Sequence, residues 1–484
     1  MNPCVSVLLV LIHLLGHRRV HTVCIFCCLV LTMLLLLFVL CVTFCISEIQ
    51  DPAAQCHLTI KNYTFDYKYS QEGDIIIGGI FTVHSWVKRW KQKGRTLYNR
   101  MCIGAHPREY THLRAFLFAI EEINNSSDIL PNVTLGYHIY DSCGHENKVI
   151  KDVLQILSGH TVTAPNYSCM ENDAVVGFIG DLHSGTSLPM AQLLSLYGYT
   201  QISYGAREPL LSNKRLYPNF FRTVPDEKIQ YAAYVKLLER FQWNWVGIIT
   251  SDDDSGRREL QELVKLFTSH QICIEFTFLV SENNLDHVPP ALKASSTDVI
   301  IICGSYSLTY IKFLYNVAPL LKNKNKTLIL PSSWSLATDL IIYRENGSPG
   351  NCSLVFSIPI NNITKKEFLN IVQLCNQPSD PLLEDLWMTL FHCYTGNKLK
   401  DFLMPLADQN PYCHCSEEMK LNKLFNFSGD ATPYQVYIAV YIMAQALHKL
   451  NIFLNYNKKT NASIIYDYKR WVSIVNSGYF IIFI

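Results

Sequence analysis

A serine at the head of a helical segment is the residue of this sequence best placed to do chemistry. Residues 174–179 are apolar, the loop GDLHSG fills residues 180–185, and a helical pattern follows over 186–197. A second apolar run covers 201–204. This order predicts a strand, a loop, a helix and a second strand, which is one βαβ unit of a parallel sheet. Ser184 lies in the loop, where the helix begins.

The start of such a helix can hold an anion. Backbone N–H groups of the first turn and the positive end of the helix dipole converge there. With its hydroxyl, Ser184 could therefore help to hold a carboxylate. The alternative is that Ser184 and Thr186 only cap the helix.

An enzyme is not expected. His183 precedes Ser184, but neighbouring side chains on a loop point apart more often than together. The sequence has no Gly-rich phosphate loop, no metal triad and no G-x-S-x-G nucleophile elbow. No cofactor is predicted.

Composition fits a large globular protein. With 484 residues, of which 49% are hydrophobic, the chain can bury a core of two or three lobes. The net charge is +1 and charged residues make up 17%. A nucleic-acid partner would need clustered basic residues, so none is expected.

The first 47 residues form a separate hydrophobic segment. Residues 23–46 are almost continuously apolar and follow a basic cluster at 17–19. This run is longer than a signal-peptide core of roughly 7–15 residues and long enough to span a membrane. Residues 1–47 are thus either a cleaved signal peptide or an uncleaved signal anchor. Both place the rest of the chain outside the cytosol.

Sequons and cysteines also indicate export. Eleven N-glycosylation sequons suit an extracellular surface, and they occur at Asn62, Asn124, Asn125, Asn132, Asn166, Asn325, Asn346, Asn351, Asn362, Asn426 and Asn461. Cysteines continue after the leader, as expected in an oxidising compartment.

Strand and helix patterns alternate along the remaining chain. Strands are predicted over 73–81, 134–141, 243–250, 272–279, 298–303 and 327–330, and helices over 112–124, 146–157, 257–270, 286–293, 308–317, 384–391 and 434–450. Asp226 is predicted to cap a helix that runs to residue 241, and residues 401–429 read as loop. We expect a lead-in over 48–71, a first lobe from 72–224 and 351–484, and a second lobe from 225–350. Two such α/β lobes bind ligands between them, at the strands' carboxyl ends.

Several segments carry a resemblance to a known family: GDIIIGGIF, HLRAFLFAIEEINNS, LPNVTLGYHIYDSC, QISYGAREPLLSNK, FFRTVPDEKIQ, WNWVGIITSDDDSG and YIAVYIMAQALHKL. Together they resemble the extracellular domain of class C G-protein-coupled receptors, most of all vomeronasal type 2 receptors, with a pattern close to calcium-sensing receptors. The resemblance covers about residues 72–475. It implies a two-lobe Venus-flytrap fold of the periplasmic-binding-protein-like type I class, with parallel sheets flanked by helices. Such a domain closes on a ligand and forms homo- or heterodimers through lobe 1. The implied function is ligand binding by a chemosensory, pheromone-type receptor at the plasma membrane.

The resemblance also implies the ligand-binding residues. In amino-acid-sensing relatives, the hydroxyl residue at the position of Ser184 holds the ligand's α-carboxylate, and the acid matched by Glu227 helps to hold its α-ammonium. Gly205, in the turn after the QISY strand, is assigned to the same site.

Three positions depart from the family pattern. Arg207 replaces a Ser or Thr, Ser255 replaces an aromatic residue, and Ser332 replaces an acid. The last two changes remove contacts worth on the order of 1–3 kcal/mol each, and Arg207 adds a charge that attracts anions. We therefore expect a peptide or an acidic odorant as ligand, and not an ordinary free α-amino acid. The alternative for Arg207 is a rim residue that is either solvated or salt-bridged, for example to Glu208.

The resemblance pairs Cys102 with Cys143 and gives Cys273 a partner in a Cys-rich module that follows the flytrap. Cys303 is expected to be a free core thiol. Residues 413–415, Cys-His-Cys, suit a disulfide better than zinc, so no metal site is predicted. Pairing is not readable for Cys56, Cys169, Cys352, Cys375, Cys393, Cys413 and Cys415.

The end of the sequence departs from the family. The chain stops at Ile484, before the Cys-rich module and the seven membrane spans. We expect an incomplete gene model, a truncated product or a secreted binding domain, and in each of these Cys273 is unpaired within the chain. The alternatives to a receptor are a secreted ligand-binding decoy and a non-signalling fragment that only dimerises.

Overall fold

The computed structural model describes the chain in segments. The described residues are 33, 63–91, 98–158, 175–281, 284, 290–304, 310, 312–314, 316–317, 320, 326–331, 353–356, 380–391, 393–394, 396–403, 413–414 and 432–456. The chain divides into two units, Met1–Leu58 and Thr59–Ile484. Apart from Met33, the predicted N-terminal hydrophobic helix lies outside the described residues. The sheets and the helices that cover them belong to the second unit.

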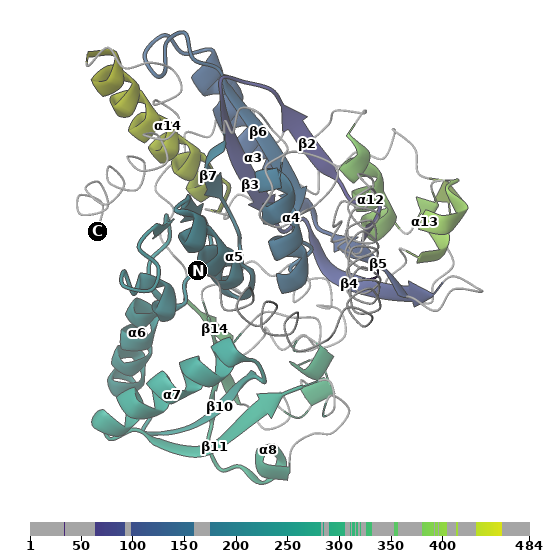
Figure 1. The fold of residues 1–484 in the computed structure, drawn as a ribbon. Helices are drawn as coiled ribbons and strands as arrows, with labels where there is room; N and C mark the ends of the chain where they lie inside the picture. Colours follow the sequence, from purple (N-terminus) through teal and green to yellow (C-terminus); the bar gives the residue numbers. More distant parts are fainter. Residues whose placement is uncertain are drawn as a thin grey trace, which may run out of the picture. The chain divides into compact units, whose positions relative to one another are not determined.

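The first sheet has six strands in the order β2-β6-β3-β7-β8-β9. Figure 1 labels four of them, β2, β6, β3 and β7. They are β2 (Lys68–Gln71), β3 (Ile75–Phe81), β6 (Leu135–Asp141), β7 (Val175–Ile179), β8 (Thr200–Ser203) and β9 (Phe220–Arg222). The edge strand β2 is antiparallel to β6, and the other pairs are parallel. Strand β3 reads IIIGGIF and is buried throughout. A parallel strand covered on both faces requires such an unbroken apolar run.

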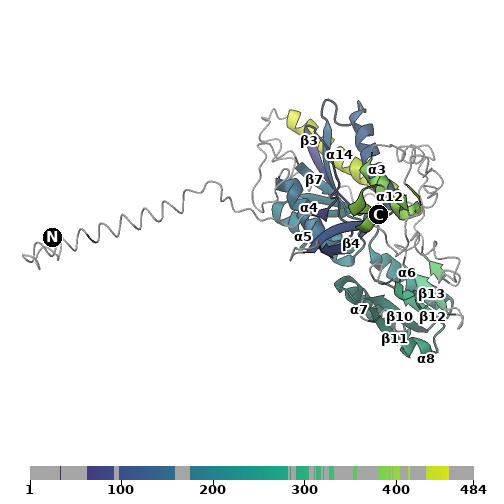
Figure 2. The ribbon, with the colours of Figure 1, turned by 90° about the vertical axis from the view of Figure 1, so that its right-hand side faces the viewer.

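Four helices cover this sheet: α3 (Pro107–Asn124), α4 (Glu146–Ser158), α5 (Ser184–Tyr197) and α14 (Thr432–Tyr456). Successive side chains of a strand point to opposite faces. Ile75 and Ile77 accordingly pack in one core cluster with residues of α3 and α14, and Ile76 and Ile80 pack in another with residues of α4 and α5. Helix α14 lies against α3, so the chain returns to this sheet near its end (Figure 2).

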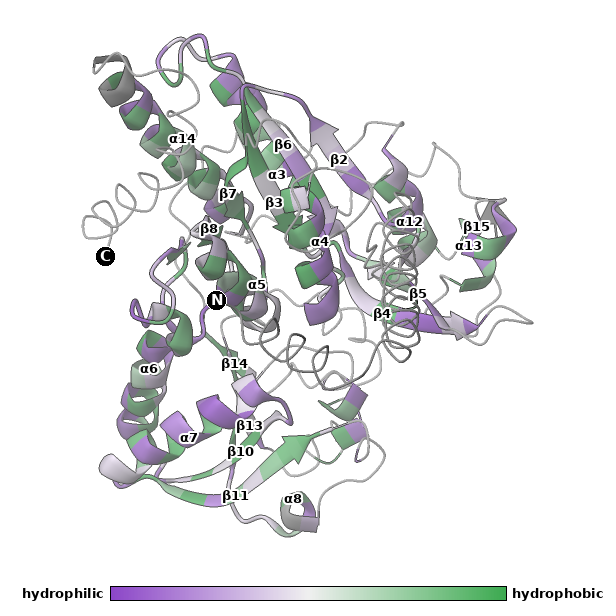
Figure 3. Ribbon diagram, viewed as in Figure 1, coloured by the Kyte–Doolittle hydropathy of each residue, from purple (hydrophilic) through white to green (hydrophobic). Residues whose placement is uncertain are grey.

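The second sheet has five strands, all parallel, in the order β11-β10-β12-β13-β14. They are β10 (Trp245–Ser251), β11 (Cys273–Val280), β12 (Val299–Ile302), β13 (Thr327–Leu330) and β14 (Ser353–Val355). Helices α6 (Glu227–Arg240) and α7 (Asp254–Ser269) pack on one face, and α8 (Pro290–Ala294) contributes to the other. Figure 3 shows many hydrophilic residues along α7, whereas its buried Leu263 and Phe267 face the sheet's core cluster.

The remaining elements are short. A three-stranded sheet has the order β1-β5-β4, with β1 (Tyr63–Thr64), β4 (His84–Lys91) and β5 (Tyr98–Ala105). The others are the 3-10 helix η1 (Pro209–Ser212), α12 (Pro381–Phe391), α13 (Lys398–Leu403) and the pair β15 (Cys393–Tyr394) and β16 (Cys413–His414). The predicted loop over 401–429 is wrong at residues 413–414, which form β16, and at residues 401–403. The latter continue a helix that begins where Asn397 Oδ1 accepts the N–H groups of Leu399 and Lys400.

Local signals set several helix starts. Asp226 caps α6 as predicted, because its side chain accepts the N–H of Lys228 at 2.9 Å. Helix α7 begins at Asp254, earlier than predicted, because Asp253 accepts the N–H of Gly256 at 2.7 Å. The predicted helices at 286–293 and 308–317 lie partly outside the described residues. Within the part of the chain that is described, no helix has the length and apolar character that a membrane crossing needs.

Candidate functional site

Polar side chains join the carboxyl ends of the first sheet's strands. Thr82 follows β3 and donates through its hydroxyl to Asp181, which follows β7, at 2.9 Å. The hydroxyl of Ser142, after β6, donates to the same carboxylate at 2.7 Å, and that of Ser203, at the end of β8, donates to the backbone oxygen of Asp181 at 2.8 Å. All four residues are buried. This network fixes the loop that leads into α5.

Ser184 is the first residue of α5, and its contacts exclude the capping interpretation. The N-cap residue is His183, which makes no side-chain cap hydrogen bond. The Ser184 Oγ instead accepts the backbone N–H groups of Arg207 at 3.1 Å and Glu208 at 3.2 Å. Because the oxygen accepts two bonds, its own proton stays available as a donor. Thr186 donates to the backbone oxygen of His183, as a local helix-start contact.

Arg207 and Glu227, both partly buried, lie side by side. The backbone N–H of Glu227 donates to the backbone oxygen of Arg207 at 3.0 Å. Burial raises the pKa of Glu227 to about 7, although a hydrogen bond from Tyr231 and the charge of Arg207 oppose the shift. Burial also lowers the pKa of Arg207, against the effect of the Glu227 charge. Near neutral pH, the carboxyl group next to Arg207 is therefore only partly ionised.

Glu208 links this region to helix α7, and sequence reasoning did not assign it to the site. Its carboxylate, 4% exposed, lies 2.5 Å from the Nε of Arg258 and accepts the hydroxyl of Ser255 at 3.3 Å. Glu208 thus forms an ion pair with Arg258, whereas the sequence suggested Arg207 as its partner. The signal that could have found Arg258 is its place one turn after Ser255 on a helix.

A second buried acid, Glu259, interacts with Glu227. Glu259, 8% exposed, accepts the N–H of Gly304 at 2.7 Å. Burial and then the charge of Glu227 raise the pKa of Glu259 well above its usual value. Two carboxyl groups that interact in this way resist being ionised together.

Gly205 allows the turn before Arg207 to lie close to the loop before α5. A Cβ on Gly205 would lie 2.4 Å from the backbone oxygen of Leu182. The structure therefore links Ser184, Arg207, Glu227 and Ser255 through neighbouring contacts, with Gly205 in the same turn. Ser332 lies outside the described residues.

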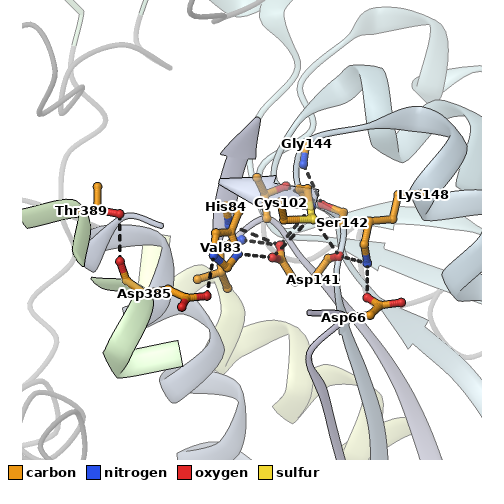
Figure 4. A network of polar contacts seen from close by, with 12 residues as sticks. Asp66, Val83, His84, Cys102, Asp141, Ser142, Gly144, Lys148, Asp385 and Thr389 are labelled. Atoms are coloured by element: carbon orange, nitrogen blue, oxygen red, sulfur yellow. Dashed lines mark hydrogen bonds and ion pairs between the residues drawn. A yellow bond between two sulfur atoms is a disulfide. The ribbon is translucent and has the colours of Figure 1, made fainter. Parts of the chain in front are cut away.

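A buried network supports the other end of the same sheet edge (Figure 4). His84 Nδ1 lies 2.5 Å from Asp141, and Nε2 lies 3.2 Å from Asp385 on α12. Burial opposes the charged imidazolium, but the two carboxylates outweigh it and raise the pKa of His84 to about 9. Beside Asp141, Cys102 and Cys143 form a disulfide, the pair that the resemblance implied. Both sulfurs are engaged there, so this cluster is a crosslink and not a thiolate metal site.

The remaining described cysteines differ in accessibility. Cys303 is free and buried, and Cys273 is free and exposed. Cys393 is disulfide-bonded.

A cavity of about 520 Å³ lies elsewhere, and none of the predicted site residues lines it. It is bordered by β2, α3 and Asp380. Asp380 accepts the hydroxyls of Tyr69 at 2.5 Å and Tyr110 at 2.6 Å, and lies 3.8 Å from the guanidinium of Arg114.

Comparisons with known proteins agree with the two-sheet α/β architecture. Residues 111–466 match the family model described as receptor family ligand binding region. The extracellular calcium-sensing receptor of Homo sapiens is 28% identical over 424 residues, covering 80% of this chain and 38% of that protein. The same receptor of Mus musculus is 30% identical, with the same coverage. Vomeronasal type-2 receptor 26 of Mus musculus is 29% identical over 407 residues, covering 79% of this chain and 45% of that protein.

The chain spans less than half the length of these relatives. The family model, in contrast, covers most of the chain. The fold, the matched region and the relatives together show that this chain belongs to the receptor family that carries this ligand-binding region, among the class C G-protein-coupled receptors.

Proposed function

We propose that this chain is the extracellular ligand-binding region of a chemosensory class C receptor. Its two sheets form two lobes, with the first lobe over 72–224 and 351–484 and the second over 225–350. The ligand binds between them, at the group formed by Ser184, Gly205, Arg207, Glu227 and Ser255, together with Ser332. A secreted decoy would share this binding step, so the proposal about the site holds for both.

The observation that supports this site best is the double hydrogen bond to Ser184. Its oxygen holds the backbone of Arg207 and Glu208, which brings the turn that carries Arg207 to the start of α5. The Ser184 proton, the first-turn N–H groups of α5 and the guanidinium are all donors or positive. Such a group suits a ligand carboxylate.

The ligand class follows from the charges around this group. An α-ammonium group is held best by an ionised acid, but burial keeps Glu227 only partly ionised near neutral pH. The Ser255 hydroxyl already donates to Glu208. We therefore propose a peptide or an acidic odorant as ligand, and not a free α-amino acid. The relatives of this chain are receptors, and we propose no catalytic activity for it.

Calorimetry on the purified, secreted chain tests the proposal. We expect no micromolar binding from a panel of the common free amino acids, and binding from some members of a panel of acidic peptides and carboxylic acids. Arg207→Ala should abolish that binding, whereas Arg257→Ala, on the exposed side of α7, should leave it unchanged. Micromolar binding of a free amino acid would contradict the ligand class, and an acidic ligand insensitive to Arg207→Ala would contradict the site.

The membrane and dimer assignments are part of the same proposal. The chain is placed on the extracellular side of the plasma membrane, and lobe 1 is the surface for a homo- or heterodimer. Light scattering of the secreted chain tests dimerisation, since a strict monomer at all concentrations would exclude a homodimer.

A further inference from the structure

Two overlapping glycosylation sequons lie at the end of α3. The sequence Asn124-Asn125-Ser126-Ser127 makes Asn124 an acceptor through Ser126 and Asn125 an acceptor through Ser127. From the sequence alone, the two asparagines are equally good candidate acceptors. The structure places them in different surroundings.

The side chain of Asn124 is part of the fold. Its Oδ1 accepts the N–H of Leu135 at 2.8 Å, and its Nδ2 donates to the backbone oxygen of Leu135 at 3.0 Å. This pair of bonds joins the end of α3 to the first residue of β6. A sugar on Nδ2 would have to enter the space between the helix end and the strand, and it would disturb this clamp.

The side chain of Asn125 is exposed. Asn125 is the C-cap residue of α3. Its backbone N–H donates to the oxygen of Glu121 at 3.1 Å, and the N–H of Ser126 donates to the oxygen of Ile123 at 3.0 Å, so the helix end uses backbone groups and not the Asn125 side chain. Ser127 is also exposed. Both Asn124 and Asn125 line the 520 Å³ cavity, so the cavity does not distinguish them. They differ in solvent exposure and in the two hydrogen bonds that the Asn124 side chain makes.

We propose that Asn125 is an N-glycan acceptor and that Asn124 is not. The inference rests on the extracellular placement in the proposed function, because the modification needs the secretory pathway. The donor is an oligosaccharide linked through pyrophosphate to a polyisoprenol lipid. The Asn125 amide nitrogen forms a bond to C1 of the first sugar, the bond from C1 to the pyrophosphate oxygen breaks, the amide loses one proton, and the lipid pyrophosphate leaves. The attached glycan covers the rim of the cavity on this side of α3.

Two matched serine substitutions separate the sequons without changing either asparagine. Ser127→Ala removes only the sequon of Asn125, and Ser126→Ala removes only that of Asn124. The full chain is expressed in secreting animal cells, and glycan occupancy is read by peptide mass spectrometry after enzymatic deglycosylation. We expect Ser127→Ala to lose one glycan and Ser126→Ala to keep the number of the unsubstituted chain.

Asn132, exposed and in the sequon Asn132-Val133-Thr134, is the internal reference for compartment. A glycan on Asn124, or a loss in Ser126→Ala in place of Ser127→Ala, overturns the assignment. An occupied Asn132 with an unmodified Asn125 overturns it while the extracellular placement stands. A chain without glycan at any sequon overturns both.

Discussion

The guanidinium Nε of Arg258 lies 2.5 Å from Oε1 of Glu208, and 50 residues separate the two in the chain. Arg258 belongs to α7, which packs on the second sheet, and Glu208 follows the strand β8 of the first sheet. The same carboxylate accepts the Ser255 hydroxyl. This ion pair therefore ties the segment around the candidate site to a helix of the other sheet.

Glu208→Gln is expected to lower the free energy of unfolding by about 1 kcal/mol. The value is modest because the Arg258 side chain is 38% exposed and water replaces part of the interaction. Urea unfolding measures it. Glu262→Gln is the control, since its pair with Lys265 is exposed and 3.4 Å long, and it should change stability by less than about 0.5 kcal/mol. Equal losses in both variants would contradict the role of Glu208.

Ser184→Ala should loosen the turn that carries Arg207. The substitution removes the oxygen that accepts the N–H groups of Arg207 and Glu208, a loss of about 1–3 kcal/mol when such partly buried donors are left without a partner. We expect hydrogen exchange at these two amides to become roughly tenfold faster or more. Mass spectrometry of exchanged peptides measures it. Ser184→Thr keeps the oxygen, so fast exchange in that variant too would count against the proposed contact.

Gly205→Ala should be strongly destabilising, because the new methyl group would meet the Leu182 oxygen at 2.4 Å. We expect a loss of about 1–3 kcal/mol from this overpacking. Gly185→Ala, in α5, is the matched control, because a Cβ there meets nothing within 4 Å. It should be neutral or stabilising by up to about 1 kcal/mol, through helix propensity. Thermal unfolding of the two variants tests this prediction. Similar midpoints for both would be inconsistent with the close approach of Gly205 to the Leu182 oxygen.

Glu227 makes stability depend on pH in a defined direction. Its pKa is raised from 4.5 to about 7 in the folded chain. The folded state therefore holds this proton more tightly than the unfolded state, so the group's contribution to stability is largest below about pH 4.5 and is lost as the pH rises towards 7. Relative to the unsubstituted chain, Glu227→Gln should gain on the order of 1–3 kcal/mol between pH 5 and pH 8. Urea unfolding at a series of pH values measures it, and parallel pH profiles for Glu227→Gln and the unsubstituted chain would refute the shift.

His84→Asn should cost about 3–5 kcal/mol, because it leaves the buried carboxylate of Asp141 without its ion-pair partner. Asp385 keeps a second cation, Lys400, at 2.6 Å. The folded pKa of about 9 lies above the usual 6.5. The stabilisation is therefore complete below about pH 6.5 and is lost as the pH rises through 9. The unsubstituted chain should lose more stability than His84→Asn between pH 7 and pH 9.5. The control is His270→Asn, because His270 forms an exposed ion pair with Glu239. A comparable loss of unfolding free energy in His270→Asn would contradict this account.

Local patterns in the sequence predicted much of the fold. The apolar run at 73–81 becomes β3 because a central parallel strand excludes polar side chains on both faces. Asp226 caps α6 because a carboxylate satisfies a first-turn N–H group within a few residues of itself. The family resemblance rested on such segments and their order, and the family comparison confirms it.

Only the tertiary structure decided which side chains meet. Nothing local to Ser184 shows that its oxygen accepts N–H groups 23 and 24 residues away, or that Glu208 pairs with Arg258. Likewise, two adjacent asparagines differ only because Leu135 lies beside one of them. The physical reason is that periodicity and capping act over a few residues, whereas these contacts depend on which strands become neighbours in the sheets and how the helices pack across them.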